Sequence, residues 1–177
     1  MALSLQDFKT ALLDATDGIT DTSGIGELGN AIATYVGDNA EVNFSWSGLN
    51  PQGVPDTAVT AKGKISGLSI SLSLSNSDNQ GNALTQMSSE IVTGFLSATC
   101  DITDVGFSTN PALMSSAPTV SSLSLSLSGD NREDVFESLA NQIISYVTGL
   151  APLTPMLGSH IAFTAPPGTG ASVTSIA

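Results

Sequence analysis

The chain has 177 residues, which suits one domain, and its 16 acidic and 4 basic residues give a net charge of −12. Four scattered cations are too few to bind a nucleic-acid backbone or an anionic membrane surface. Charged residues make up only 11% of the chain, against about 25% in ordinary domains. The surface must therefore be covered by small uncharged side chains or by another protein.

Three further features bear on where the chain works. No segment is apolar for long enough to span a membrane. Residues 1–7 lack the cationic and apolar regions of a signal peptide, and Cys100, being single, cannot form an intrachain disulfide. We therefore expect a protein that is made in a cytoplasm.

The first two elements expected along the chain are amphipathic helices. One is predicted over residues 5–15, with Ser4 as its N-cap and Asp7 completing a capping box. Its apolar face consists of Phe8, Leu12 and Leu13. The second is expected to end at Gly37. Its apolar residues recur at helical spacing: Ile25, Leu28, Ile32 and Val36.

Alternation with period two predicts the strands. Residues 42–46 alternate apolar and polar side chains and are expected to form a strand, followed by a loop over residues 50–56. Two later segments, Ile65–Leu74 and Val120–Leu127, alternate leucine or isoleucine with serine. Leucine and serine are weak strand formers, but strict alternation would place apolar groups all round a helix. We therefore predict strands for both serine–leucine segments.

Each serine–leucine segment leads through a polar turn into another helix. The third helix follows residues 76–79, and its apolar face consists of Leu84, Met87, Ile91 and Phe95. The fourth follows Gly129, with Asp130 as the expected cap and Glu133 as its partner. Its apolar face consists of Val135, Leu139, Ile143 and Val147.

The helices resemble one another, which suggests an internal repeat. Five residues of the second helix match five of the fourth at one constant offset: Leu28, Asn30, Ile32, Tyr35 and Val36 against Leu139, Asn141, Ile143, Tyr146 and Val147. The central helix matches less fully, with Val92, Phe95 and Leu96 at the places of Ile32, Tyr35 and Val36. Chance similarity between amphipathic helices is the alternative, above all for this central match.

A short strand candidate follows each of these three helices: Val42–Trp46, Val105–Phe107 and Ile161–Phe163. We therefore predict one α+β domain over residues 1–177, with amphipathic helices packed on an antiparallel β-sheet. Its units would be three helix–strand–strand repeats over approximately residues 20–75, 76–128 and 129–177, preceded by the helix over residues 5–15. Tyr35 and Tyr146 are expected at equivalent helix ends, each packing on the strand that follows.

The chain offers few groups for catalysis or for binding metal. His160 is the single histidine and lies in a polar turn, and no cluster of cysteine and histidine exists to hold a soft metal. Residues 168–171 are expected to be a hairpin tip rather than a phosphate-binding turn. Three acidic clusters occur: Asp14, Asp17 and Asp21; Asp101 and Asp104; and Asp130, Glu133 and Asp134.

None of the acidic clusters has the spacing of a calcium loop, and all lie at expected element ends, where acidic residues cap helices. Capping is therefore favoured over calcium binding. We expect no catalytic residue, no cofactor-binding residue and no metal-binding residue, and no cofactor.

One degenerate pattern resembles a known class of proteins. Its residues are Leu28, Ala31, Ile32, Tyr35 and Val36, then Ala40, Glu41 and Val42, glycines 48 and 53, and Gly63, Lys64 and Ile65. Part of it occurs again at Leu139–Val147, with residues 163–168 as its tail. The pattern resembles small virion structural proteins of tailed phages and prophages, and together its two occurrences cover about half the chain.

This resemblance implies a non-enzymatic particle-building role near the tail, baseplate or neck, and it transfers no catalytic residue. The expected partners are copies of the chain and other virion structural proteins, with no direct contact to nucleic acid or membrane. The expected location is the virion, assembled in the host cytoplasm. A capsid decoration protein, a bacterial surface adhesive module and a small carboxylate-dependent hydrolase are the alternatives.

Overall fold

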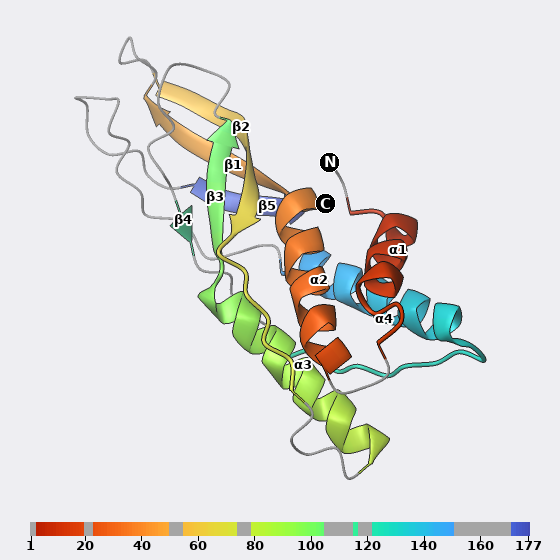
Figure 1. The fold of residues 1–177 in the computed structure, drawn as a ribbon. Coiled ribbons are helices and arrows are strands. Elements are labelled where there is room, and N and C mark those ends of the chain that lie inside the picture. Colours follow the sequence, from red (N-terminus) through yellow and green to blue (C-terminus); the bar gives the residue numbers. More distant parts are fainter. Residues whose placement is uncertain are drawn as a thin grey trace.

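The computed structural model describes residues 3–19, 23–49, 55–73, 79–104, 115–116, 122–150 and 171–177 (Figure 1). The helices in these ranges are α1 (Leu5–Ala15), α2 (Ser23–Asn39), α3 (Gln80–Ser97) and α4 (Arg132–Thr148). The strands are β1 (Glu41–Leu49), β2 (Pro55–Ser66), β3 (Thr99–Asp104), β4 (Ser115–Ser116) and β5 (Ala171–Ile176). The fold is α+β, as predicted. No helix in the described ranges is long and apolar enough to cross a membrane.

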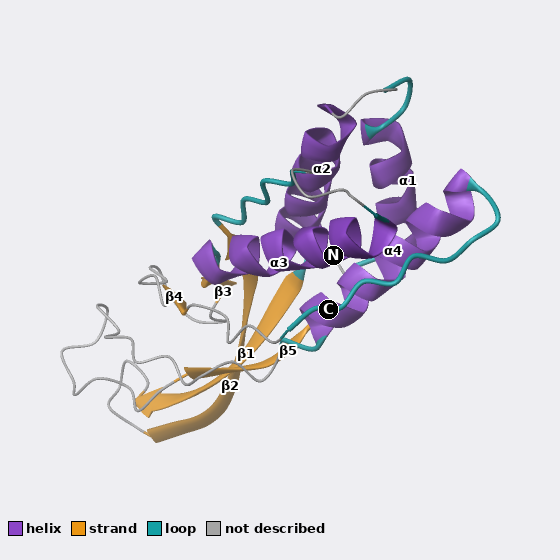
Figure 2. Ribbon diagram, turned by 90° about the horizontal axis from the view of Figure 1, so that it is seen from below, coloured by secondary structure: helices purple, strands orange, loops and turns teal. Residues whose placement is uncertain are grey.

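The strands form one antiparallel sheet in the order β4-β3-β2-β1-β5. The helices gather at one end of this sheet rather than spreading over its face (Figure 2). At that end Val42, Ile65 and Ile176 are buried, and α2 contacts β2 while α4 contacts β5. In the described residues these contacts between helices and strands lie at the end of the sheet.

Several expected strand and loop positions can be compared with the sheet. The strand expected over residues 42–46 lies within β1. Pro55 and Asp56, expected in a loop, begin β2, and the rest of that loop lies outside the described residues. The strand candidates Val105–Phe107 and Ile161–Phe163 also lie outside them.

Helix α1 has the predicted bounds, but one of the two hydrogen bonds of the predicted capping box is replaced by another. The Ser4 hydroxyl accepts from the Asp7 N–H at 3.4 Å, as an N-cap should. The Ser4 N–H, which a capping box would direct to Asp7, instead donates to the Tyr35 hydroxyl at 3.0 Å. The start of α1 is therefore held by a residue of α2.

Two predicted helix ends were wrong. Helix α2 continues through Gly37 to Asn39, because an interior glycine costs only about 1 kcal/mol and Asn39 Nδ2 bonds the Tyr35 carbonyl at 2.9 Å. The N-cap of α4 is Asn131, not Asp130: its side chain accepts from the Asp134 N–H at 3.0 Å. An amide oxygen at this position satisfies the same orphan donor that a carboxylate would.

The strand prediction for the serine–leucine segments was wrong beyond Ser66, where β2 ends. Residues 68–73, here called strap 1, and residues 122–128, called strap 2, run as long loops beside the helices, and among the described residues neither pairs with a strand (Figure 2). Burial still alternates: Ile70, Leu72 and Leu125 are buried and every serine of the straps is exposed. The alternation in sequence is thus an alternation in burial, although no strand forms. Leu74, Val120 and Ser121 lie outside the described residues.

Helices α2, α3 and α4 bury residues at the same spacing. The buried sets are Leu28, Gly29, Ile32, Tyr35 and Val36 in α2; Met87, Ser88, Ile91, Gly94 and Phe95 in α3; and Leu139, Ala140, Ile143, Tyr146 and Val147 in α4. This corrects the expected match of the central helix by one residue. Leu96, expected at the place of buried Val36, is 58% exposed, and Phe95 takes that place.

Each strap lies between two of these helices. A Cβ added at Gly29 of α2 would stand 2.6 Å from the Ile70 carbonyl, and one at Gly94 of α3 would stand 2.7 Å from the Ser69 carbonyl, so strap 1 lies between α2 and α3. Strap 2 bonds α3 through Leu125 and α4 through Ser126. Helix α1 completes the cluster by packing against α2 and α4.

Candidate functional site

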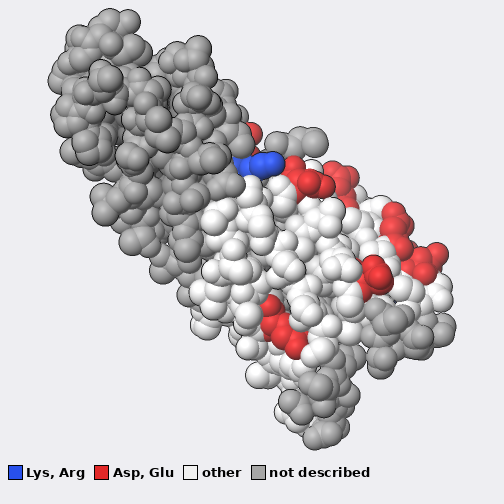
Figure 3. All heavy atoms as spheres, turned by 60° about the vertical axis from the view of Figure 1, so that its left-hand side comes forward, with Lys and Arg blue, Asp and Glu red and all other residues white. Residues whose placement is uncertain are grey.

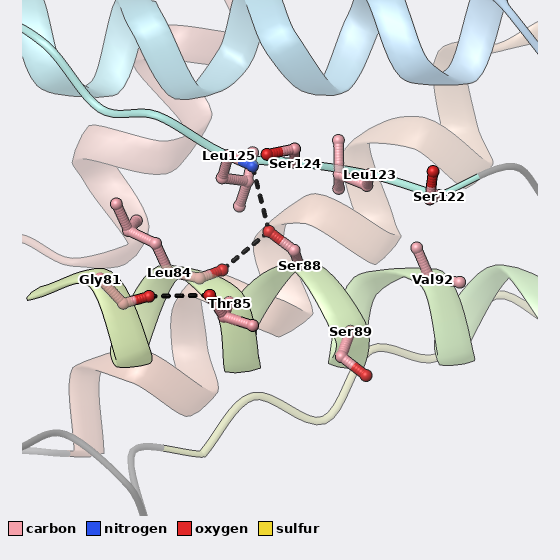
Figure 4. Close-up of a pocket in the computed structure, with 10 residues that line it drawn as sticks. All are labelled: Gly81, Leu84, Thr85, Ser88, Ser89, Val92, Ser122, Leu123, Ser124 and Leu125. Atoms are coloured by element: carbon pink, nitrogen blue, oxygen red, sulfur yellow. Dashed lines mark hydrogen bonds between the residues drawn. The ribbon is translucent and has the colours of Figure 1, made fainter.

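A groove runs along α3 beside strap 2 and has a volume of about 550 Å³ (Figure 4). Its lining residues are Gly81, Leu84, Thr85, Ser88, Ser89 and Val92 of α3 and Ser122, Leu123, Ser124 and Leu125 of strap 2. None of them is charged. The groove combines leucine and valine side chains with small polar ones.

Ser88 fixes the position of strap 2 on α3. Its hydroxyl accepts from the Leu125 N–H at 3.1 Å and donates to the Leu84 carbonyl at 2.7 Å (Figure 4). The Thr85 hydroxyl likewise donates to the Gly81 carbonyl, at 2.9 Å. Ser88 and Thr85 thus direct their protons to backbone carbonyls, and no histidine or carboxylate lines the groove to activate them as nucleophiles.

Among the described residues, the backbone of strap 2 is hydrogen-bonded to the helices at Leu125 and Ser126 but not at the three residues before them. Ser126 is held by the Gln142 side chain, which accepts its N–H at 2.9 Å and donates to its carbonyl at 2.8 Å. Upstream of Leu125, Ser122 and Ser124 are exposed and Leu123 is half-buried. Within the described part of the chain, the backbone groups of these three residues make no hydrogen bond. One wall of the groove is therefore alternating chain whose backbone groups are available for pairing.

Strap 1 is held by a carboxylate instead. Glu90 accepts the Ser73 N–H at 2.8 Å and the Ser73 hydroxyl at 2.7 Å, and Gln86 Nε2 donates to Glu90 at 2.9 Å. Partial burial raises the pKa of Glu90, but the hydrogen bonds from Gln86 and Ser73 outweigh it and leave the pKa below its ordinary value. Glu90 is the single charged residue of α3, so the side of this helix that faces the groove carries no charge.

A second pocket, of about 720 Å³, lies where the end of α1 meets the start of α4. Arg132 Nη2 donates to the Leu13 carbonyl at 2.9 Å and to the Thr16 hydroxyl at 2.8 Å. Asp14, Asp17 and Glu133 also line this pocket, so parts of two acidic clusters meet around one guanidinium. Arg132 thereby caps the carbonyl end of α1, which is a structural role.

The expected site residues are distributed as follows. His160, Asp21 and residues 168–170 lie outside the described residues. Within the described ranges, no three histidine, cysteine or acidic side chains are grouped to hold a metal ion. Cys100 lies in β3 opposite Ile65, while Lys62 and Lys64 of β2 lie opposite Asp104 and Asp101.

Both tyrosines pack on aromatic residues of other helices, and the strand expected to follow Tyr146 lies outside the described residues. Tyr35 stacks on Phe8 of α1 with ring centroids 4.5 Å apart, and its hydroxyl donates to the Ser4 carbonyl at 2.9 Å. These two contacts are with α1 and with its N-cap residue. Tyr146 meets Phe95 of α3 edge to face, with centroids 5.5 Å apart, and burial raises its pKa to about 12.

Sequence reasoning missed the groove, although one signal was present. Helix α3 has 18 residues and a single charge, whereas the 17 residues of α4 include Arg132, Glu133, Asp134 and Glu137. The solvent-facing side of α3 thus has little charge, and low charge is typical of the central part of protein–protein interfaces. Comparisons with known protein families, curated proteins and solved structures find no match to this chain.

Proposed function

We propose that this chain is a non-enzymatic structural subunit of a phage or phage-like particle, in the tail, baseplate or neck, which works by self-assembly and by contact with neighbouring virion proteins. The observation that carries the proposal is the uncharged groove along α3, in a chain whose net charge is −12. Uncharged surface of this kind favours contact between proteins over repulsion between acidic copies.

The charged residues support the same function. Lys9 bonds Glu137 at 2.8 Å, and Arg132 caps α1, so both cations of the helical cluster serve internal contacts. In the view of Figure 3, acidic side chains form small separate groups between wide uncharged areas. A surface of this kind is poorly suited to nucleic acid or to an anionic membrane, and it leaves other proteins as the favoured partners.

The sheet offers a second region for lateral contact. Among the described residues β4 and β5 are its outer strands, and β4 consists of two residues. Strand β5, residues 171–176, contains valine, threonine and isoleucine and no charged residue or proline. It therefore lacks the charges and prolines that usually protect outer strands from pairing with another chain.

The three units over residues 20–75, 76–128 and 129–177 belong to the same proposal. The shared burial spacing of α2, α3 and α4 supports a repeat, as does the position of strap 1 and strap 2 between successive helices. Repeated units suit a particle subunit because each can present a similar surface to a neighbour. Superposition of the three units in an experimental structure, with a common order of helix and strands, is the test.

The function is tested on particles. We expect antibodies against the chain to label purified virions or injection particles by electron microscopy, and the chain to bind purified tail, baseplate or neck proteins. A variant without residues 122–128, which form strap 2, tests whether this binding depends on the groove. A chain that is absent from particles and binds none of these proteins would contradict the proposal. Labelling over the capsid would favour the alternative of a decoration protein.

A further inference from the structure

We propose that the groove between α3 and strap 2 docks a second copy of this chain, with the two α3 helices and the two segments over residues 122–124 facing each other across a two-fold axis. This inference rests on the proposed function and names the surface through which self-assembly would occur. The groove is open to solvent along α3, and strap 2 forms one of its walls (Figure 4).

The charge distribution favours a second copy as the occupant. Two chains that each carry a net charge of −12 repel each other wherever acidic surfaces approach. The groove avoids this repulsion because none of its ten lining residues is charged and because Glu90 bonds strap 1 instead. An acidic or basic partner would find no complementary charge here, whereas an identical uncharged groove matches it.

The side chains beside the groove supply apolar area for the contact. Leu96 lies one turn beyond Val92 on the same side of α3. Its side chain is 58% exposed, which makes it the one exposed large hydrophobic residue among the described residues. Leu84 and Leu123 are half-buried in the groove wall. Association about a two-fold axis would cover these groups on both copies at once.

The backbone of strap 2 determines how the two copies would be oriented relative to each other. Ser122, Leu123 and Ser124 alternate in burial and, within the described chain, have backbone N–H and carbonyl groups without hydrogen bonds. A strand-like segment in this state pairs readily with another such segment. A two-fold axis perpendicular to these segments would bring them together antiparallel, so one contact would combine backbone pairing with apolar burial.

The test is the oligomeric state of charge variants of the full chain. Wild-type protein is expected to form dimers, or larger species built from them, in sedimentation velocity between about 1 and about 100 µM. Ser89→Glu and Leu96→Glu each place two like charges across the axis and should raise the dissociation constant about tenfold or more. Asn141→Glu and Thr148→Glu, at the matching positions of α4, are the controls and should leave it unchanged.

Hydrogen exchange provides a second readout. Amides of residues 84–96 and 122–125 should become better protected at high protein concentration, and this gain should be lost in the Leu96→Glu variant. Circular dichroism checks that each variant remains folded.

The outcomes separate this inference from the proposed function. Wild-type oligomers that none of the groove charges weakens would overturn the groove as the contact while leaving the particle function intact. A wild-type monomer overturns the groove contact as well. If that monomer still binds virion proteins and the groove charges abolish this binding, the occupant is a different protein. If it binds none of them, the proposed function also fails.

Discussion

Strap 1 and strap 2 have nearly the same sequence pattern, yet the helices hold them in different ways. Strap 1 passes Gly29 of α2 and Gly94 of α3 so closely that an added Cβ would stand 2.6 Å and 2.7 Å from its carbonyl oxygens. At the places that correspond in the burial spacing, the helices on either side of strap 2 carry Ser88 and Tyr146. Larger side chains leave strap 2 held through hydrogen bonds rather than through direct backbone contact.

The difference shows how a groove arises from a small change in a packed cluster. Two glycines allow strap 1 to lie against both helices, and van der Waals contact then fills the space. Strap 2 is held by the Ser88 hydroxyl at Leu125 and by the Gln142 side chain at Ser126, and a groove remains beside it. The more tightly packed strap is therefore expected to serve stability, and the more open one is available for contact with a partner.

The largest effect should come from filling the glycine positions beside strap 1. Gly29→Ala and Gly94→Ala are each expected to lower the free energy of unfolding by about 1–3 kcal/mol, because the new methyl group must displace backbone carbonyls. Gly26→Ala is the matched control in α2, since an added Cβ there meets nothing within 4 Å. It should raise stability by up to about 1 kcal/mol through helix propensity. Urea unfolding measures all three, and equal effects would contradict the tight packing of strap 1.

Removing the hydroxyl that holds strap 2 should have a smaller effect. Ser88→Ala leaves the Leu125 N–H without its partner in a buried position and should cost about 1–2 kcal/mol. Hydrogen exchange should accelerate at Leu125 while strap 1 remains protected. Thr85→Ala, which removes an exposed hydroxyl bonded only to its own helix, is the control and should change stability by less. Simultaneous loosening of both straps would show that they are not held independently.

A third expected effect appears at alkaline pH and concerns Tyr146, which is packed against Phe95 of α3. Burial raises the pKa of Tyr146 from 10.0 to about 12, so the neutral phenol stabilises the fold fully below about pH 10. This contribution is lost as the pH rises toward the folded-state value. Tyrosinate absorbance of the wild type minus that of Tyr146→Phe should show one transition near pH 12. A transition near 10 in folded protein would contradict the burial of this hydroxyl.

The smallest effect is expected on hydrogen exchange in acid, because strap 1 is bonded to the ionisable Glu90 and strap 2 to the neutral Gln142. The pKa of Glu90 lies below its ordinary value of 4.5, so its bonds to Ser73 contribute fully above that value and are lost as the pH falls through the lowered pKa. Corrected for intrinsic rates, exchange protection of the Ser73 amide should therefore fall on acidification. The Ser126 amide, held by neutral Gln142, is the internal control and should respond less. Glu90→Gln should remove the difference.

Local patterns predicted the elements well and their partners poorly. The bounds of α1 and the apolar faces of α3 and α4 followed from spacing, because helix formation depends on nearby residues. Alternation in the straps corresponds to alternating burial, but the strands predicted from it do not form. It could not predict that Ser73 and Ser126 would bond helix side chains rather than a neighbouring strand, because that choice depends on tertiary packing.

The groove was harder to predict for a related reason. The expected match of the central helix to α2 places Val92 and Leu96 at the positions of Ile32 and Val36, which are buried. The structure places Val92 in the groove wall and leaves Leu96 exposed, because the alignment of α3 with α2 is shifted by one residue and Ile91 and Phe95 take those places. A shift of one residue rotates a helix face by about 100°. An amphipathic pattern with apolar residues at adjacent positions does not determine the buried side of a helix to within one residue.

The position of α1 has a consequence for the direction in which the protein can grow. Helix α1 contacts both α2 and α4, the first and last of the three helices that share one burial spacing. In stacked arrays, end units whose apolar faces are left open recruit further units and extend the stack into fibres. Here α1 is bonded to both of these helices, through Ser4 to Tyr35 of α2 and through Lys9 to Glu137 of α4. In the proposed assembly of repeated units, α1 would therefore cover the first and the last unit, and further copies would add at the flank formed by α3.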